Sequence, residues 1–117
     1  MRFDFEKLNV YQKALDFTDE VYKVSRSFPR EEQFGITSQL RRASLSIPLN
    51  IAESCGRRQK NDRRHFLDMA RGSVHECIPL IEMCCRQRYV DNILKDKLYE
   101  NCSELSRMIC GLINSLK

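Results

Sequence analysis

The stretch ITSQLRRASLSIPLNIAE, residues 36–53, indicates the fold class of this chain. Its apolar residues recur at steps of three and four, which is the spacing of one buried face of an α-helix. These positions are Ile36, Leu40, Ala43, Ile47 and Ile51. Pro48 interrupts the pattern because it lacks a backbone N–H group, so we expect a kink there. The hydroxyl of Ser44 or Ser46 is expected to satisfy the carbonyl that Pro48 leaves free.

Three other segments repeat this spacing, one before that stretch and two after it. The first contains Val10, Ala14, Phe17, Val21, Val24 and Phe28, the second Phe66, Ala70, Ser73, Cys77, Leu80 or Ile81 and Cys84, and the third Leu94, Leu98, Cys102, Leu105, Ile109, Leu112 and Leu116. Short polar joints separate the segments, and short joints between long helices make consecutive helices antiparallel neighbours. The sequence therefore predicts one all-α domain over residues 1–117, an antiparallel up-down-up-down four-helix bundle.

Local signals predict where these helices begin and end. Asn9 and Gln12 have the spacing of a capping box at the start of the first helix. Pro29 should end that helix, because the residue before a proline disfavours the α conformation. Asp91 or Asn92 is expected to cap the last helix at its N-terminus.

Composition places the chain among compact globular proteins, with 117 residues of which 42% are hydrophobic and 31% charged. The N-terminal residues mix acidic with apolar side chains and do not resemble a signal peptide. No stretch approaches the roughly 20 apolar residues of a membrane span. We therefore expect no membrane association and a cytoplasmic location. The six cysteines fall inside helical patterns, so we expect reduced thiols in the core; they are Cys55, Cys77, Cys84, Cys85, Cys102 and Cys110.

The sequence offers little for catalysis or metal binding. Helical and loop zinc sites use paired ligands such as C-x-x-C or H-E-x-x-H, and neither pattern occurs. His75 and Glu76 are followed by Cys77, Ile78 and Pro79, so the second histidine is missing. The Glu-x-x-His pairs of a di-iron bundle, phosphate-binding glycine loops and nucleophile elbows are absent as well. We predict no catalytic residue, no cofactor and no metal, and expect that the protein is not an enzyme.

Polar residues also follow helical spacing beside the apolar face of residues 36–53. They include Gln39, Arg42 or Ser46, Asn50 and Glu53. Such a row could form an active site, but a hydrogen-bonded network that fixes the register between helices is the stronger interpretation. The predicted structural polar network comprises Arg42, Asn50, Glu53, Ser73 and Glu76.

Positive charge is concentrated between residues 41 and 64. This window holds seven Arg or Lys and two acidic residues, so the rest of the chain, whose total net charge is +4, carries −1. Arginine binds phosphate through its planar fork, and several such contacts give salt-dependent affinity for nucleic acid. The predicted nucleic-acid-binding residues are Arg57, Arg58, Lys60, Arg63 and Arg64. Pairing with Glu53, Asp62 and Asp68 would instead make this a solvated helix end, and the two interpretations stay open.

Some apolar residues lie off the predicted helix seams. Tyr11, Leu15 and Tyr22 do so in the first helix, and Tyr99, Met108 and Ile113 in the last. They can contact a second copy of the chain, or they can widen the core of the bundle itself.

Several segments resemble a known family. LNVYQKALDF at 8–17, FPREEQFGITSQLRRASLSIPLNIAE at 28–53 with GRR at 56–58, and FLDMARGSVHE at 66–76 are similar to the four-helix-bundle proteins encoded by intervening sequences of bacterial large-subunit ribosomal RNA genes. The motif positions matched are Arg41, Arg42, Asn50, Glu53, Gly56, Arg57, Gly72, Ser73 and Glu76. The chain departs from the pattern at Ser54-Cys55, where the family has Gly, and at Pro79, where it has a plain helix former.

The resemblance implies a homopentamer, similar also to the accessory protein of diversity-generating retroelements, a basic pentameric barrel that binds nucleic acid and a reverse transcriptase. The leading hypothesis is a non-enzymatic oligomer that binds RNA or DNA phosphates without reading sequence. The alternative is an interaction scaffold that docks a protein partner, such as a polymerase or reverse transcriptase.

Overall fold

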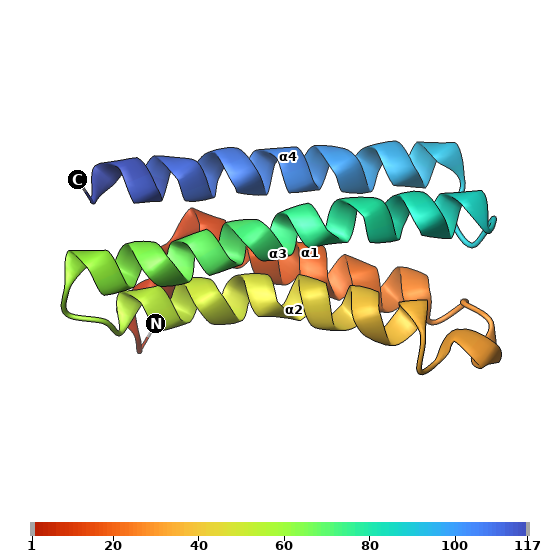
Figure 1. The fold of residues 1–117 in the computed structure, drawn as a ribbon, viewed down its shortest axis with the longest axis horizontal. Helices are drawn as coiled ribbons and strands as arrows, with labels where there is room; N and C mark the ends of the chain where they lie inside the picture. Colours follow the sequence, from red (N-terminus) through yellow and green to blue (C-terminus); the bar gives the residue numbers. More distant parts are fainter. Residues whose placement is uncertain (1, 117) are drawn as a thin grey trace.

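The computed structural model describes residues 2–116 and contains four long helices arranged as a bundle (Figure 1). Their bounds are Asn9–Ser25 for α1, Ile36–Cys55 for α2, Lys60–Arg86 for α3 and Asn92–Ser115 for α4; two short 3₁₀ helices, η1 (Asp4–Lys7) and η2 (Arg30–Glu32), precede α1 and α2. The chain reverses direction at each joint, so consecutive helices are antiparallel (Figure 1), and residues 2–116 contain no strand. The predicted all-α up-down-up-down bundle is confirmed.

The four helices pack around one core. Helix α2 lies against α1 and α3, and α4 lies against α3 and, less closely, against α1. Every helix contributes a buried apolar row. The rows are Val10, Ala14, Phe17 and Val21 in α1; Leu40, Ala43, Ile47 and Ile51 in α2; Leu67, Ala70, Val74, Cys77, Ile81 and Cys84 in α3; and Leu98, Cys102, Leu105 and Ile109 in α4. The apolar spacing therefore located the buried faces of α1, α2 and α4.

In α3 the predicted row was wrong by one residue at two places. Leu67 and Val74 are buried in the core, where Phe66 and Ser73 had been expected. Phe66 and Ser73 lie on the edge of the same face that borders α2: Phe66 is half-buried beneath Arg57, and Ser73 meets Ser46 of α2. Leu67 and Val74 lie three residues before Ala70 and Cys77, whereas Phe66 and Ser73 lie four residues before them. Steps of three and of four both return to the same side of a helix, so the sequence spacing allows either pair.

The helix ends agree with the sequence signals in part. Asp91 caps α4, its Oδ1 accepting the backbone N–H of Leu94 at 2.8 Å, as predicted. The expected capping box of Asn9 is wrong, because α1 begins after Leu8 without a side-chain cap. Gln12 instead donates to the carbonyl of Glu6 at 3.0 Å and ties η1 to α1. Helix α1 also ends at Ser25, ahead of the predicted proline stop.

The proline in α2 is accommodated differently from the expectation. Pro48 is buried within the helix, and it deprives the carbonyl four residues earlier, that of Ser44, of its helical donor. The hydroxyls of Ser44 and Ser46 donate to carbonyls in the turn before them, those of Arg41 and Ala43. The Ser44 carbonyl lies 2.9 Å from the hydroxyl of Thr18 on α1. That hydroxyl is also 2.9 Å from the Ala14 carbonyl of its own helix, so the two carbonyls share one donor. Neighbouring helices thus share a polar contact inside the core.

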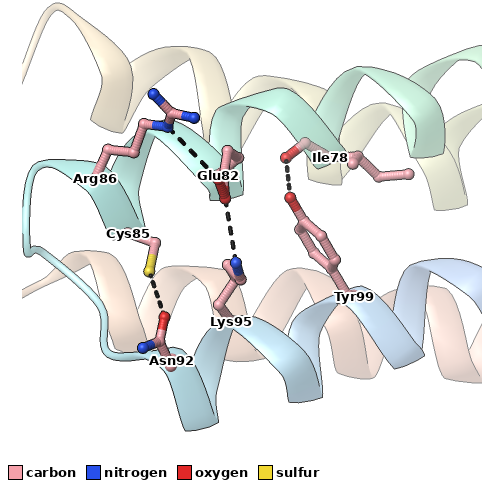
Figure 2. A network of polar contacts seen from close by, with 7 residues as sticks. All are labelled: Ile78, Glu82, Cys85, Arg86, Asn92, Lys95 and Tyr99. Carbon is pink, nitrogen blue, oxygen red and sulfur yellow. Dashed lines mark hydrogen bonds and ion pairs between the residues drawn. The ribbon is translucent and has the colours of Figure 1, made fainter.

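Polar contacts also link the last turns of α3 to the first turns of α4 (Figure 2). Glu82 of α3 lies 3.2 Å from the ammonium of Lys95 on α4 and 3.6 Å from Nε of Arg86. The hydrogen bond with Lys95 lowers the pKa of Glu82 and raises the pKa of Lys95. One turn further along, the hydroxyl of Tyr99 donates to the carbonyl of Ile78 at 3.4 Å. These contacts fix the register of α4 on α3.

All six cysteines are free thiols, and Cys77, Cys84 and Cys102 are buried in the core. Burial disfavours the charged thiolate, and it raises the pKa of Cys84 to about 11 and that of Cys102 to about 12. Within residues 2–116 no group of three metal-ligating side chains comes together. Over the same residues, none of the helices has the length and apolar character needed to cross a membrane.

Candidate nucleic-acid interface

The predicted phosphate-binding residues gather where α2 ends and α3 begins. Helix α2 closes at Gly56, whose N–H donates to the carbonyl of Glu53 at 3.1 Å, and the backbone of Arg57 donates to Ser54 at 3.3 Å. Helix α3 then starts at Lys60. Residues 56–64, which we name the α2–α3 joint, therefore form a tight reversal at one end of the bundle (Figure 1).

Arg57 is held by the fold itself. Its Nη2 donates to Oε1 of Glu53 at 2.7 Å, and its guanidinium lies 4.5 Å from the ring centre of Phe66. An arginine that is both paired with a carboxylate and stacked on an aromatic ring has less capacity for an external phosphate. Arg57 therefore links the end of α2, through Glu53, to the second turn of α3, through Phe66.

Two other members of the predicted set also make internal contacts. Nε of Arg63 donates to the carbonyl of Arg57 at 2.6 Å, and Arg63 is half-buried. Arg64 donates to the side-chain oxygen of Asn61. These bonds stiffen the joint from the α3 side, although each guanidinium keeps further N–H groups that are not used in them.

Arg58 and Lys60 are the outward members of the set. Both are exposed, and in the described part of the chain neither forms an ion pair or a side-chain hydrogen bond. Glu53 pairs with Arg57. Within residues 2–116, Asp62 and Asp68 form no ion pair with a residue of the α2–α3 joint. Lys60 is also the first residue of α3, where the helix dipole already favours anions.

The predicted polar network is smaller than expected. The hydroxyls of Ser46 on α2 and Ser73 on α3 contact each other, and Asn50 donates to the carbonyl of Ser46 at 2.8 Å. Arg42, Glu53 and Glu76 are exposed and take no part in this contact. Long charged side chains at the outer edge of the α2–α3 pair can keep their charged groups in water, so they need no partner on the other helix. Only the short serine hydroxyls meet between the two helices.

The sequence did not indicate a second basic cluster. Arg26, Arg30 and Arg41 surround a cavity at the α1–α2 joint, the opposite end of the bundle from residues 56–64 (Figure 1). Counting charge along the chain hides them because Glu31 and Glu32 lie between them in sequence. Their spacing around Phe28-Pro29, where the chain must reverse, was the available signal.

Comparison with known proteins finds a matching family model and a solved structure with the same fold. The family model described as 23S rRNA-intervening sequence protein matches residues 6–111. A solved structure of a protein with unknown function from the S23 ribosomal protein family of Bacteroides thetaiotaomicron VPI-5482 is 21% identical, with a TM-score of 0.82 over 89% of this chain and 97% of that chain. At that identity the likeness shows the fold alone. No curated protein matches the chain.

Proposed function

This chain belongs to the 23S rRNA-intervening sequence protein family, and from that premise we propose that it is a non-enzymatic protein that binds nucleic-acid phosphates without reading sequence. The observation that carries the proposal is the pair Arg58 and Lys60, exposed at the start of α3 on a joint whose other arginines brace it. We place its action in the cytoplasm, a compartment whose reducing conditions suit six free thiols.

The geometry of the joint suits phosphate contact. A helix N-terminus carries partial positive charge and N–H groups without helical acceptors, which attract anions. Cations are unusual in this position because the dipole repels them, and here Lys60 and Arg58 add to the same positive field, which Asp62 in the first turn partly offsets. The contacts of Arg57 and Arg63 limit the motion of the backbone that carries them. Little conformational freedom is then lost when a phosphate binds.

A single pair of cations binds weakly, so the proposal includes assembly into a homo-oligomer, a pentamer by the family resemblance. Four exposed apolar side chains on α2 and α3, which we name the outer strip, support assembly; they are Leu45, Leu49, Met69 and Met83. The off-seam residues considered from sequence offer less, since Tyr11, Tyr99, Met108 and Ile113 pack against the chain's own core. Several copies in one ring would multiply the affinity of each joint.

The same strip also supports the alternative, a scaffold that docks a protein partner such as a polymerase or reverse transcriptase. Exposed apolar side chains are a usual feature of a protein interface, and they would serve a foreign partner as well as a second copy. In that case nucleic-acid contact at residues 56–64 is incidental to function.

The test compares two variants of equal net charge. Arg58→Glu with Lys60→Glu reverses the outward pair, whereas Arg71→Glu with Arg107→Glu reverses two exposed arginines in the middle of α3 and α4. Binding of single-stranded RNA and duplex DNA is measured by fluorescence polarisation across a salt series. We expect the first variant to bind more weakly, with a log–log salt slope that shrinks by about 0.7–0.9 for each phosphate that it no longer neutralises.

Four results would count against the proposal. Wild-type protein that fails to bind at low salt, or whose affinity hardly varies with salt, contradicts phosphate contact. Equal losses of affinity in the two variants would mean that net charge matters and the joint does not. If the Arg58 and Lys60 reversal spares nucleic-acid binding while binding to a purified reverse transcriptase is lost, the scaffold alternative is correct.

A further inference from the structure

A basic cavity lies at the α1–α2 joint, at the end of the bundle far from residues 56–64. It has a volume of about 320 Å³. The last turn of α1, the segment around η2 and the first turns of α2 form its walls, and its polar lining is Ser25, Arg26, Arg30, Gln33, Thr37 and Arg41. We call it the joint cavity.

The charge of the joint cavity is not balanced by the protein. Three arginines line it and no carboxylate does. The nearby acid Glu32 is engaged elsewhere, its Oε2 accepting the hydroxyl of Tyr89 at 2.9 Å. None of the ion pairs among residues 2–116 includes Arg26, Arg30 or Arg41. A concave surface with unpaired guanidinium groups concentrates anions.

Arg41 is held in place, with part of its guanidinium unused. Its Nε donates to Oγ of Ser25, a buried residue, at 2.7 Å, and its guanidinium lies 4.9 Å from the ring centre of Tyr22. Neither terminal nitrogen has a partner in the part of the chain that the structure describes. Such an arginine is fixed in position for a bidentate contact, and less side-chain entropy is lost on binding.

Thr37 supplies a second, independent observation at the joint cavity, a buried hydroxyl without a protein partner among the described residues. Only 6% of the residue is exposed, and its Oγ1 is the one buried side-chain oxygen or nitrogen in residues 2–116 that lacks a hydrogen-bond partner. Buried hydroxyls are almost always satisfied. Thr37 also lies in the first turn of α2, whose leading N–H groups have no acceptor within the helix.

We propose that the joint cavity binds a phosphate monoester, with Arg41, Arg26 and Arg30 neutralising its charge and the hydroxyl of Thr37, which is covered in the absence of a ligand, rotating toward the cavity to donate to one of its oxygens. A tetrahedral dianion has enough acceptor oxygens for guanidinium groups arriving from α1, η2 and α2, whereas a planar carboxylate is satisfied by one fork. The phosphate can belong to a free mononucleotide or to the 5′ end of an RNA. This site is separate from the joint of residues 56–64 and does not depend on it.

Thr37→Val is the sharpest variant because valine has nearly the same shape and lacks the hydroxyl. Isothermal titration calorimetry with adenosine monophosphate and with inorganic phosphate measures binding, and thermal unfolding without ligand checks the fold. We expect affinity to fall several-fold while the melting temperature is unchanged or rises, because the substitution removes an unsatisfied buried group. Arg26→Gln with Arg30→Gln, both exposed positions, should abolish binding.

Further measurements distinguish the source of the phosphate. An RNA oligonucleotide with a 5′-phosphate is compared with the same oligonucleotide bearing a 5′-hydroxyl, using protein that carries Arg58→Glu and Lys60→Glu. Tighter binding of the phosphorylated RNA, lost in Arg26→Gln with Arg30→Gln, identifies an RNA end; equal binding of both RNAs with retained binding of adenosine monophosphate identifies a free mononucleotide. The inference is overturned if neither adenosine monophosphate nor phosphate binds at millimolar concentration, or if the Thr37 and arginine variants bind as wild type does.

Discussion

The hydroxyl of Thr18 on α1 lies 2.9 Å from the carbonyl oxygen of Ser44 on α2. That carbonyl lacks its helical donor because Pro48, four residues later, has no N–H group. Thr18 and Ser44 are both buried, so water cannot replace the missing donor. A side chain of the neighbouring helix thereby supplies the donor that α2 lacks, and it shares that donor with the Ala14 carbonyl at 2.9 Å.

We expect Thr18→Val to destabilise the protein by about 1–3 kcal/mol, because it leaves a buried carbonyl unsatisfied while nearly preserving side-chain volume. The free energy of unfolding is measured by urea titration. In a Pro48→Ala background the alanine N–H can bond to the Ser44 carbonyl, and the cost of Thr18→Val should shrink. Additive effects of the two substitutions would show that Thr18 and Pro48 are not coupled through that carbonyl.

The arginines of the α2–α3 joint should separate into a structural and a binding class. Arg57→Ala removes the pair with Glu53 and the contact with Phe66, so we expect a loss of about 1 kcal/mol in the free energy of unfolding. Arg58→Ala should change stability by less than about 0.5 kcal/mol and weaken RNA binding. The opposite assignment would emerge if Arg58→Ala lowered the melting temperature and Arg57→Ala left it unchanged.

The outer strip of α2 and α3 should control assembly. Leu49 is 60% exposed and Met69 45% exposed, so Leu49→Gln with Met69→Gln should leave the bundle folded. We expect light scattering after gel filtration to show an oligomer for wild type and a smaller mass for this variant. Ile93→Gln, an exposed position on α4, serves as the control and should leave the mass unchanged. A wild-type monomer would refute assembly through this face.

The sequence sufficed for the bundle because burial repeats along every helix. Leu98, Cys102, Leu105 and Ile109 each occupy the core position that the spacing of α4 predicts. The spacing of apolar residues was less exact in α3, because Ser73 and Phe66 fit it as well as the buried Val74 and Leu67 do. Packing against α2 decided between the two rows, and such packing involves residues far apart in sequence.

The candidate site was predictable only as a segment. Residues 56–64 were recognised by their charge, but the division between Arg57, which braces the joint, and Arg58, which faces water, depends on the position of the Phe66 ring. The joint cavity was not predictable by counting charge, because Arg41 joins Arg26 and Arg30 only when α2 folds back along α1. Nor does sequence reveal that the Thr37 hydroxyl lacks a partner.

The buried thiols make stability depend on alkaline pH. Burial raises the pKa of Cys102 from 9.0 to about 12 and that of Cys84 to about 11, and it raises the pKa of Cys77 as well. The folded state therefore holds these protons more tightly than the unfolded chain does. Their contribution is complete below pH 9 and is lost as the pH rises toward the folded-state pKa values.

We expect the urea midpoint of wild type to fall progressively above pH 9, the ordinary thiol value. Cys102→Ala should be less stable at neutral pH, because it leaves a cavity, yet its midpoint should decline less steeply with pH, since one of the three shifted thiols is gone. Iodoacetamide labelling of the native protein provides an independent check: the half-buried Cys55, Cys85 and Cys110 should react before the three core thiols. A decline equally steep in both proteins would assign the alkaline loss to other groups, because the variant differs from wild type in that thiol alone.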